Sequence, residues 1–271
     1  MQTKRKKRLI ILLLIAIPVY IGICTYVYFN QEKFLFQYYK INTNIEYKIN
    51  VPFEETNFRT DSGVLINGLY FKQKNAKGIV IINRGSGGSL ENYSPKQSVF
   101  YNDLNYDVFI YDYRGNGKSQ GNSENMESLF HDLRFIYKHF SQIYGEENIV
   151  LLGDSFGTGI AAKIASENNP KHLILKASYY KYNELLRRRS GWMPLGLIVK
   201  YNFKTFEYLE KCSCPVLLIH GEQDDAIKPK ASERLYKHIN SEKHLLIIKN
   251  AGHSNLSKYP EYNKTIKSLL E

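Results

Sequence analysis

A chain of 271 residues is long enough for one large α/β domain with an appendage, or for two small domains. Its hydrophobic content of 43% is sufficient for a buried core, and its formal net charge of +11 invites comparison with nucleic-acid-binding proteins. However, residues 4–8 supply five of the positive charges and no acidic residue precedes Glu32. The remaining charge is dispersed, apart from three arginines at 187–189, so we expect no nucleic-acid partner.

The N-terminal region contains a long apolar segment, because residues 9–29 carry no charged side chain. A helix of this length, at about 1.5 Å of rise per residue, crosses a hydrocarbon core of about 30 Å. A cleaved signal peptide is the alternative, but its apolar part spans only about 7–15 residues and ends in small residues that are not found here. We therefore expect a single transmembrane helix.

The charges that flank this segment predict its orientation. Five basic residues precede it, whereas Glu32, Lys33 and Lys40 form a mixed flank after it, so the N-terminus is expected in the cytoplasm and the remainder outside it. The predicted domains are a basic tip with an anchor over residues 1–30 and a globular domain over 31–271. Several aromatic residues follow the membrane span. Either they lie at the lipid headgroup boundary, or they form a segment that packs on the globular domain. These residues are Tyr26, Tyr28, Phe29, Phe34, Phe36, Tyr38 and Tyr39.

The globular part begins with extended segments and then alternates strands with helices. Segments 44–50, 55–59 and 64–72 read as extended, with a turn at 61–63 that indicates an antiparallel entry to a sheet. The subsequent strands are predicted at 78–82, 107–111, 149–152, 173–175, 216–219 and 245–248. The helices are predicted at 94–104, 126–144, 155–167, 230–239 and 259–270, and the second carries one apolar stripe of Leu129, Leu133, Ile136, Phe140 and Ile143. This alternation predicts an α/β fold with a mostly parallel sheet covered on both faces.

Residues 178–213 interrupt the alternation and are too long for an ordinary connection, so we interpret them as a lid over the carboxyl edge of the sheet. Two interpretations of its apolar residues stay open: they form the wall of an acyl-chain site, or they only pack the lid on the sheet. These residues are Tyr179, Tyr180, Tyr182, Trp192, Leu195, Leu197 and Ile198. Cys212 and Cys214 close the segment and are interpreted as small structural residues, because a disulfide across one residue is strained.

The sequence G-D-S-F-G at residues 153–157 lies between a predicted strand and a predicted helix. This order describes a nucleophile elbow, in which a sharp turn pushes the hydroxyl of Ser155 into a cleft. The glycines remove side chains that would collide with the neighbouring strand and helix. Ser155 is therefore the candidate nucleophile.

A serine hydroxyl is a weak nucleophile near neutral pH, so it requires a base and an acid that holds the base. Asp224 follows the strand at 216–219, and His253 follows the strand at 245–248. The order Ser, Asp, His is that of α/β-hydrolases. Asp225 is an adjacent alternative acid, and we favour Asp224 because it matches the motif.

The tetrahedral intermediate requires two amide donors for its oxyanion. The backbone N–H of Phe156, directly after the nucleophile, is one candidate. The backbone N–H of Ser86 is the other, since the glycine-rich loop after the strand at 78–82 turns inward. A loop that binds a phosphate group is the alternative, but this loop lacks the Gly-Lys-Ser/Thr ending of a P-loop and the spacing of G-x-G-x-x-G.

Four ordered motifs resemble the α/β-hydrolase superfamily, and within it the membrane-anchored Bem46/ABHD13-like serine hydrolases and the related serine aminopeptidase-like group. The motifs are D-Y-R-G-N-G-K-S at 112–119, the elbow at 153–157, H-G-E-Q-D-D-A-I at 220–227 and Gly252-His253. The resemblance covers the chain from about Asn57 onward and implies the α/β-hydrolase fold with a short lid. The chain departs from the family at Arg84, where the usual loop reads His-Gly, and this leaves the identity of the oxyanion donor open.

The resulting hypothesis is a membrane-tethered serine hydrolase that cleaves an ester, thioester or amide through an acyl-enzyme. The expected substrate is a small acyl compound with an apolar chain, and the reaction requires neither a metal nor an organic cofactor. A serine exopeptidase is the nearest alternative, with Glu184 as a weak candidate for binding an amine. A non-catalytic membrane-tethered protein is the alternative of another class. The oligomeric state stays open.

Overall fold

The computed structural model describes residues 2–35 and 39–271, without the side chains of residues 2, 3, 35, 188 and 189. Phe36 and Tyr38, two of the predicted exit aromatics, lie outside the described residues. Within the described part of the chain, eight strands form one sheet in the order β1-β2-β4-β3-β5-β6-β7-β8. Their bounds are β1 Glu54–Arg59, β2 Leu65–Phe71, β3 Ile79–Asn83, β4 Asp107–Tyr111, β5 Ile149–Asp154, β6 His172–Lys176, β7 Val216–Gly221 and β8 Lys243–Ile248.

The sheet is mostly parallel, as predicted. β1 and β2 pair antiparallel, as do β2 and β4, while every pair from β4 to β8 is parallel. All residues of β3, β4 and β7 are buried, which explains their continuous apolar sequences, since a parallel sheet is covered on both faces. The carboxyl ends of β3, β5, β7 and β8 consequently meet at one edge.

One of the three segments that were expected to be extended is not part of the sheet. Residues 44–50 form no strand; instead Tyr47 is buried against the sheet face, and its hydroxyl donates to Asn67 Oδ1 at 2.7 Å. Tyr47 and the partly buried Ile49 pack on the domain, and the segment pairs with no strand. Extended backbone and a strand look alike in a short apolar sequence.

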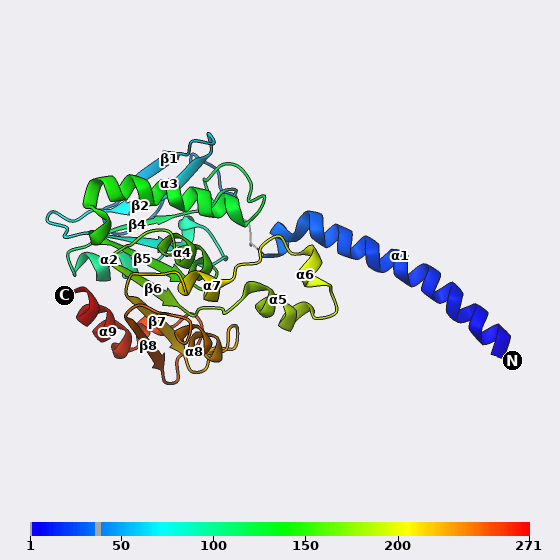
Figure 1. Cartoon of the computed structure of the whole chain (residues 1–271). Helices are drawn as coiled ribbons and strands as arrows, with labels where there is room; N and C mark the ends of the chain where they lie inside the picture. The colour runs from blue at the N-terminus through cyan, green and yellow to red at the C-terminus, as the bar shows by residue number, and fades with distance from the viewer. Residues whose placement is uncertain (1, 36–38) are drawn as a thin grey trace.

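Helices cover both faces of the sheet (Figure 1). α2 (Lys96–Asn102) and α9 (Pro260–Leu270) pack on one face, and α3 (Met126–Tyr144), α4 (Gly157–Ala165) and α8 (Lys230–Tyr236) on the other. Short 3-10 turns lie at Leu90–Asn92, Glu146–Asn148 and Leu256–Lys258. The predicted stripe of α3 is buried except at its end, where Ile143 is 57% exposed. The stripe continues instead to Tyr144, four residues after Phe140, whose ring packs against the same cluster.

Three short helices occupy the predicted lid, and the sequence had predicted none of them: α5 (Tyr182–Ser190), α6 (Leu195–Ile198) and α7 (Thr205–Leu209). Tyr179, Tyr182 and Leu195 are buried, whereas Trp192 is 57% and Leu197 85% exposed. The set therefore divides between residues that pack the lid on the domain and residues that are exposed, and the acyl-chain site stays a prediction. Cys212 and Cys214 are buried free thiols.

Helix α1 (Gln2–Leu35) leaves the domain and is almost entirely exposed (Figure 1). Among the described residues, one helix is long and apolar enough to cross a membrane, over Lys4–Phe34. The helix continues through Pro18. Its domain-proximal half contacts α6, so the apolar helix and the lid lie side by side.

Candidate active site

The turn between β5 and α4 holds Ser155 in a strained conformation. Its φ of +50° lies in the left-handed region, which non-glycine residues seldom adopt. A Cβ at Gly153 would lie 2.7 Å from the Cα of Thr158, and one at Gly157 would lie 2.6 Å from the carbonyl carbon of Asn83. The Ser155 N–H donates to the carbonyl of Lys176 at 2.9 Å, which ties the turn to β6. The two glycines therefore have the steric role that the sequence predicted.

Three residues far apart in sequence meet at the carboxyl edge of the sheet. His253 Nε2 lies 2.9 Å from Ser155 Oγ, and His253 Nδ1 lies 2.7 Å from Asp224 Oδ2. A carboxylate only accepts hydrogen bonds, so Nδ1 carries the proton and Nε2 accepts from the serine hydroxyl. The His253 side chain is 26% exposed, while that of Asp224 is fully buried. The imidazole is thus reachable from solvent and its acid is not.

The geometry distinguishes Asp224 from Asp225. Besides His253, the Asp224 carboxylate accepts the backbone N–H groups of Ala226 and Ile227 at 2.9 and 2.8 Å. The Asp225 side chain is 93% exposed and pairs with Lys228. Asp224 is therefore fixed in its loop, and Asp225 faces solvent.

His220 is a second histidine at this carboxylate, and the sequence analysis had given it no role. Its Nε2 lies 2.8 Å from the carbonyl of Ile227 and 3.2 Å from Asp224 Oδ2, so Nε2 carries the proton, and Nδ1 accepts from the Ser232 hydroxyl at 2.6 Å. Burial alone would raise the pKa of Asp224, but the hydrogen bonds from His220, His253 and Ile227 outweigh it, so the pKa lies below its usual value. In the sequence, the role of His220 could have been predicted from its position at the end of a buried strand, four residues before Asp224.

The two predicted oxyanion donors flank the nucleophile. Phe156 follows Ser155 directly, and the loop that contains Ser86 approaches it, since a Cβ at Gly85 would lie 3.8 Å from the Ser155 Cβ. The Ser86 residue is partly exposed beside this approach. Binding of the oxyanion by the backbone N–H groups of Ser86 and Phe156 stays a prediction.

Arg84, where the chain departs from the family, braces this loop. Its guanidinium donates to the carbonyls of Gly85 and Gly87 at 3.2 and 2.9 Å. Nη2 also lies 2.7 Å from Asp112 Oδ1, so the two side chains form an ion pair. The Asp112 side chain is fully buried, and this burial raises its pKa against the opposing effect of Arg84.

The D-Y-R-G-N-G-K-S loop holds the same backbone from its other side. The Tyr113 hydroxyl donates to the carbonyl of Arg84 at 2.6 Å, and Asp112 Oδ2 accepts the N–H of Leu90 at 3.1 Å. Asn116 Nδ2 donates to the carbonyl of Gly88 at 2.8 Å. Two loops therefore fix the 84–90 backbone together, and this pairing was not visible from either motif alone.

An ion pair between a buried lysine and a partly exposed aspartate lies next to the elbow. Lys176 Nζ lies 2.8 Å from Asp154 Oδ2, and Lys176 is buried. Burial lowers the pKa of this lysine, but the charge of Asp154 outweighs burial and the net direction is upward. The residue before the nucleophile is thereby joined to the lysine whose carbonyl accepts the Ser155 N–H.

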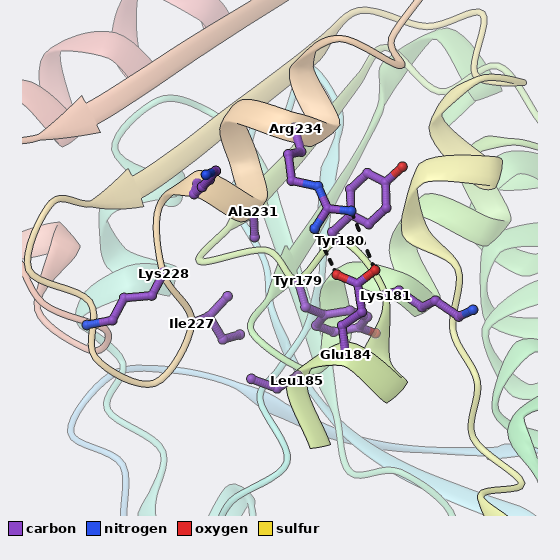
Figure 2. A pocket seen from close by; sticks show the side chains of 10 residues that line it. Tyr179, Tyr180, Lys181, Glu184, Leu185, Ile227, Lys228, Ala231 and Arg234 are labelled. Atoms are coloured by element: carbon purple, nitrogen blue, oxygen red, sulfur yellow. Dashed lines mark hydrogen bonds and ion pairs between the residues drawn. The ribbon is translucent and has the colours of Figure 1, made fainter. Parts of the chain in front are cut away.

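A cavity of about 390 Å³ opens between α5 of the lid and α8 (Figure 2). Two of its lining residues contact the neighbourhood of the triad: Tyr179 donates from its hydroxyl to the Phe156 carbonyl at 3.0 Å, and the Ile227 N–H donates to Asp224. Figure 2 shows Glu184 facing Arg234 across the cavity, with oxygen–nitrogen distances of 2.8 and 3.4 Å. The other charged residues of the lining are the basic residues Lys181, Lys228 and Lys230.

Sequence comparison places these features in a family. Residues 74–205 and 198–258 match the family described as serine aminopeptidase, S33. The chain is 26% identical to human alpha/beta hydrolase domain-containing protein 17B over 78% of this chain and 73% of that protein. It is also 26% identical to the lysophosphatidylserine lipase ABHD12 of Danio rerio, over 49% of this chain and 39% of that protein.

Solved structures agree on the fold. The esterase Pf2001 of Pyrococcus furiosus superposes with a TM-score of 0.70 at 18% identity, covering 86% of this chain and 95% of that one. Est1E of Butyrivibrio proteoclasticus, solved with ferulic acid, gives 0.61 at 18% identity, covering 79% and 96%. The predicted α/β-hydrolase fold is confirmed. By the match over most of its globular part, the chain belongs to the serine aminopeptidase S33 family of α/β-hydrolases and is a hydrolase of that fold.

Proposed function

We propose that the protein is a membrane-anchored serine hydrolase that cleaves an acyl ester or thioester through the triad Ser155, His253 and Asp224. One observation carries the proposal: the continuous hydrogen-bond path from Ser155 Oγ through the imidazole to the buried carboxylate, at 2.9 and 2.7 Å. A path of this length and polarity is what proton transfer from a serine requires.

In this mechanism Ser155 Oγ attacks the carbonyl carbon while His253 Nε2 takes the hydroxyl proton. Asp224 holds the imidazole in the required tautomer and stabilises the imidazolium. The backbone N–H groups of Ser86 and Phe156 bind the oxyanion. The imidazolium then gives its proton to the leaving alcohol or thiol. A water molecule, deprotonated by His253, attacks the acyl-enzyme, and the imidazolium returns this proton to Ser155 Oγ as the acid is released.

The cavity favours a substrate without a free amine. An aminopeptidase must bind an α-ammonium group, and a carboxylate of its own usually serves this purpose. The carboxylate that lines the cavity, Glu184, already pairs with Arg234, and Lys228 pairs with Asp225, so Lys181 and Lys230 leave the lining positively charged. An ammonium would be repelled there, whereas an acyl compound with a neutral or anionic group would be accepted.

The family description favours a second candidate function, a serine exopeptidase, since the same triad cleaves amides. The two candidates differ in the charge that the cavity accepts. Paired substrates resolve them: aryl esters and acyl thioesters of increasing chain length on one side, and aminoacyl amides on the other. We expect hydrolysis of the esters and thioesters, and the reverse preference would favour the exopeptidase.

The nucleophile is tested by fluorophosphonate labelling of the detergent-solubilised full chain. We expect covalent modification of the wild type and none of Ser155→Ala, with a loss of hydrolysis of about 10⁴-fold or more. Ser254→Ala is the matched control, because it removes a nearby hydroxyl that lies outside the proton path. Equal labelling of wild type and Ser155→Ala would refute the proposed nucleophile.

The anchor is part of the same proposal. The length and apolarity of α1 support a single membrane span, and the basic residues before it support a cytoplasmic N-terminus. The catalytic domain then faces the extracytoplasmic side. A C-terminal reporter that is active only outside the cytoplasm is expected to be active, and activity of a cytoplasm-only reporter would reverse the orientation.

A further inference from the structure

The lid contacts α1 at two levels. At the level nearer the N-terminus, the Tyr20 hydroxyl donates to the carbonyl of Trp192 at 3.0 Å, and the two rings lie 6.1 Å apart. At the other level, Gln31 Nε2 donates to the carbonyl of Ile198 at 3.0 Å, and Gln31 Oε1 accepts the Lys200 N–H at 2.8 Å. The lid segment from 192 to 200 thus runs along the helix.

The second level is polar and lies just beyond the apolar stretch. The Glu32 carboxylate is 3.3 Å from both Lys200 Nζ and the Tyr201 hydroxyl, and the Lys200 ammonium lies 4.9 Å from the centre of the Tyr28 ring. Charged and aromatic side chains of this kind gather where a membrane helix leaves the hydrocarbon. This level therefore corresponds to the membrane–water interface.

The first level lies inside the apolar stretch. Tyr20 is about 13 Å along the helix axis from Phe29, at a rise of about 1.5 Å per residue. Lipid offers no hydrogen-bond partners, so backbone groups at membrane depth need partners within the protein. The Tyr20 hydroxyl supplies one for the carbonyl of Trp192, and turns within the segment supply others, from Leu195 to Met193 and from Leu197 to Pro194.

The outward side chains of this segment are large and apolar. Trp192 is 57% and Leu197 85% exposed, and the Trp192 ring lies 6.1 Å from the ring of Tyr20 on the exposed apolar surface of α1. Apolar exposure that is continuous with a membrane span is accounted for by lipid. Arg187, on α5 before the segment, is exposed and suits anionic headgroups; the side chains of the next two arginines lie outside the described residues.

We infer that residues 192–198 insert into the extracytoplasmic leaflet beside α1, with lipid acyl chains as their partner. This inference rests on the proposed membrane anchor and is independent of the proposed chemistry. The lid and the anchor then form one embedded unit, so the lid opens toward the bilayer. An acyl substrate that resides in the leaflet reaches the enzyme without crossing water.

Trp192 is the single tryptophan of the chain, so intrinsic fluorescence reports the position of this segment without labelling. The full chain is reconstituted into phosphatidylcholine vesicles, with or without bromine on the acyl chains, and recovered by flotation. We expect brominated lipid to reduce Trp192 emission at least twofold, and iodide in the buffer to have little effect. Quenching by iodide with no effect of brominated lipid would overturn the inference.

A double variant, Trp192→Phe with Ile143→Trp, moves the fluorophore to an exposed site on α3 of the globular domain. Its emission is expected to respond to iodide in vesicles and not to brominated lipid. In a second variant, Leu197→Glu, the charge is harmless in water but disfavoured in hydrocarbon, so we expect the bromine effect on Trp192 to fall by at least half. An unchanged bromine effect in Leu197→Glu would exclude insertion of the segment.

Fluorophosphonate labelling of the same vesicles separates this inference from the proposed function. Quenching by brominated lipid without labelling would refute the chemistry and retain the inserted lid. Labelling without such quenching would retain the chemistry and refute the inserted lid.

Discussion

The carboxyl edge of the sheet and the lid differ in what fixes them. At the edge, backbone lies against backbone: a Cβ at Gly157 would lie 2.6 Å from the carbonyl carbon of Asn83. In the lid, a Cβ at Gly196 would meet no atom within 4 Å, and Leu197 beside it is almost fully exposed. Close packing of the backbone therefore fixes the conformation of the edge, whereas the tip of the lid has few neighbours within the globular domain.

The edge and the lid therefore have different roles: the edge carries out the chemical step, and the lid controls which substrates reach it. The elbow, the acid loop and the oxyanion loop are held by contacts to main-chain atoms, which hold positions to within the tolerance that proton transfer requires. The lid segment is held by side chains of α1. Substitutions at the edge are therefore expected to change the chemical step, and substitutions in the lid to change which substrates arrive.

The largest contrast is expected between two glycine substitutions. Gly157→Ala forces a methyl group against the β3 carboxyl end, so we expect a loss of about 3 kcal/mol or more of unfolding free energy and no measurable hydrolysis. Gly196→Ala fills open space in a short helix and is expected to change stability by less than about 1 kcal/mol. Chemical denaturation and ester hydrolysis measure both, and a tolerated Gly157→Ala would break the comparison.

The next largest effect concerns the acid. Asp224→Asn keeps the shape of the side chain but favours the wrong tautomer of His253, so we expect kcat to fall about 10³- to 10⁴-fold. Asp225→Asn is the matched control, because that side chain is 93% exposed, and its kcat is expected within twofold of wild type. Equal losses in the two variants would assign the acid role to neither residue alone.

A smaller effect is expected at Arg84. Arg84→Met removes the guanidinium from the carbonyls of Gly85 and Gly87 and leaves buried Asp112 without its cation. We expect kcat to fall about 10- to 100-fold with KM nearly unchanged, because a looser Ser86 amide weakens binding of the oxyanion. The affinity for a trifluoromethyl ketone, whose adduct carries an oxyanion, is expected to fall in parallel. A change in KM alone would indicate a role in substrate binding instead.

The smallest effect is on the pH dependence of stability. The pKa of Asp224 lies below its usual value in the folded protein, so the unfolded chain binds more protons at this carboxyl in acid. The stabilisation of the folded protein by the Asp224 carboxylate is complete above about pH 4. It is lost as the pH falls through the pKa that Asp224 has in the folded protein. The difference in unfolding free energy between wild type and Asp224→Asn is therefore expected to narrow below pH 4, by on the order of 2 kcal/mol. A difference independent of pH would contradict this account.

Elements that depend on residues close together in the sequence were predicted correctly, and elements that depend on contacts between distant residues were not. Strands such as β4 and the 19 residues of α3 were predicted at their observed bounds, because apolar runs and hydrophobic periodicity are local signals. The lid helices escaped prediction because they are short and are stabilised by packing on α4 and contacts with α1. Ile143 was assigned to the wrong face because the buried stripe can continue at three or four residues.

The amino-acid sequence was sufficient to predict the fold class, because strands and helices alternate along it. It was also sufficient to predict the order of Ser155, Asp224 and His253 and the glycines of the elbow, because each belongs to a short motif after a buried strand. The tertiary structure alone decided the contacts that join distant positions around the site: Tyr113 with the carbonyl of Arg84, Lys176 with Asp154, and Glu184 with Arg234. Such pairs join positions that are separated along the chain by loops or whole elements. Their partners are set by how the strands are ordered in the sheet, which no local pattern of residues encodes.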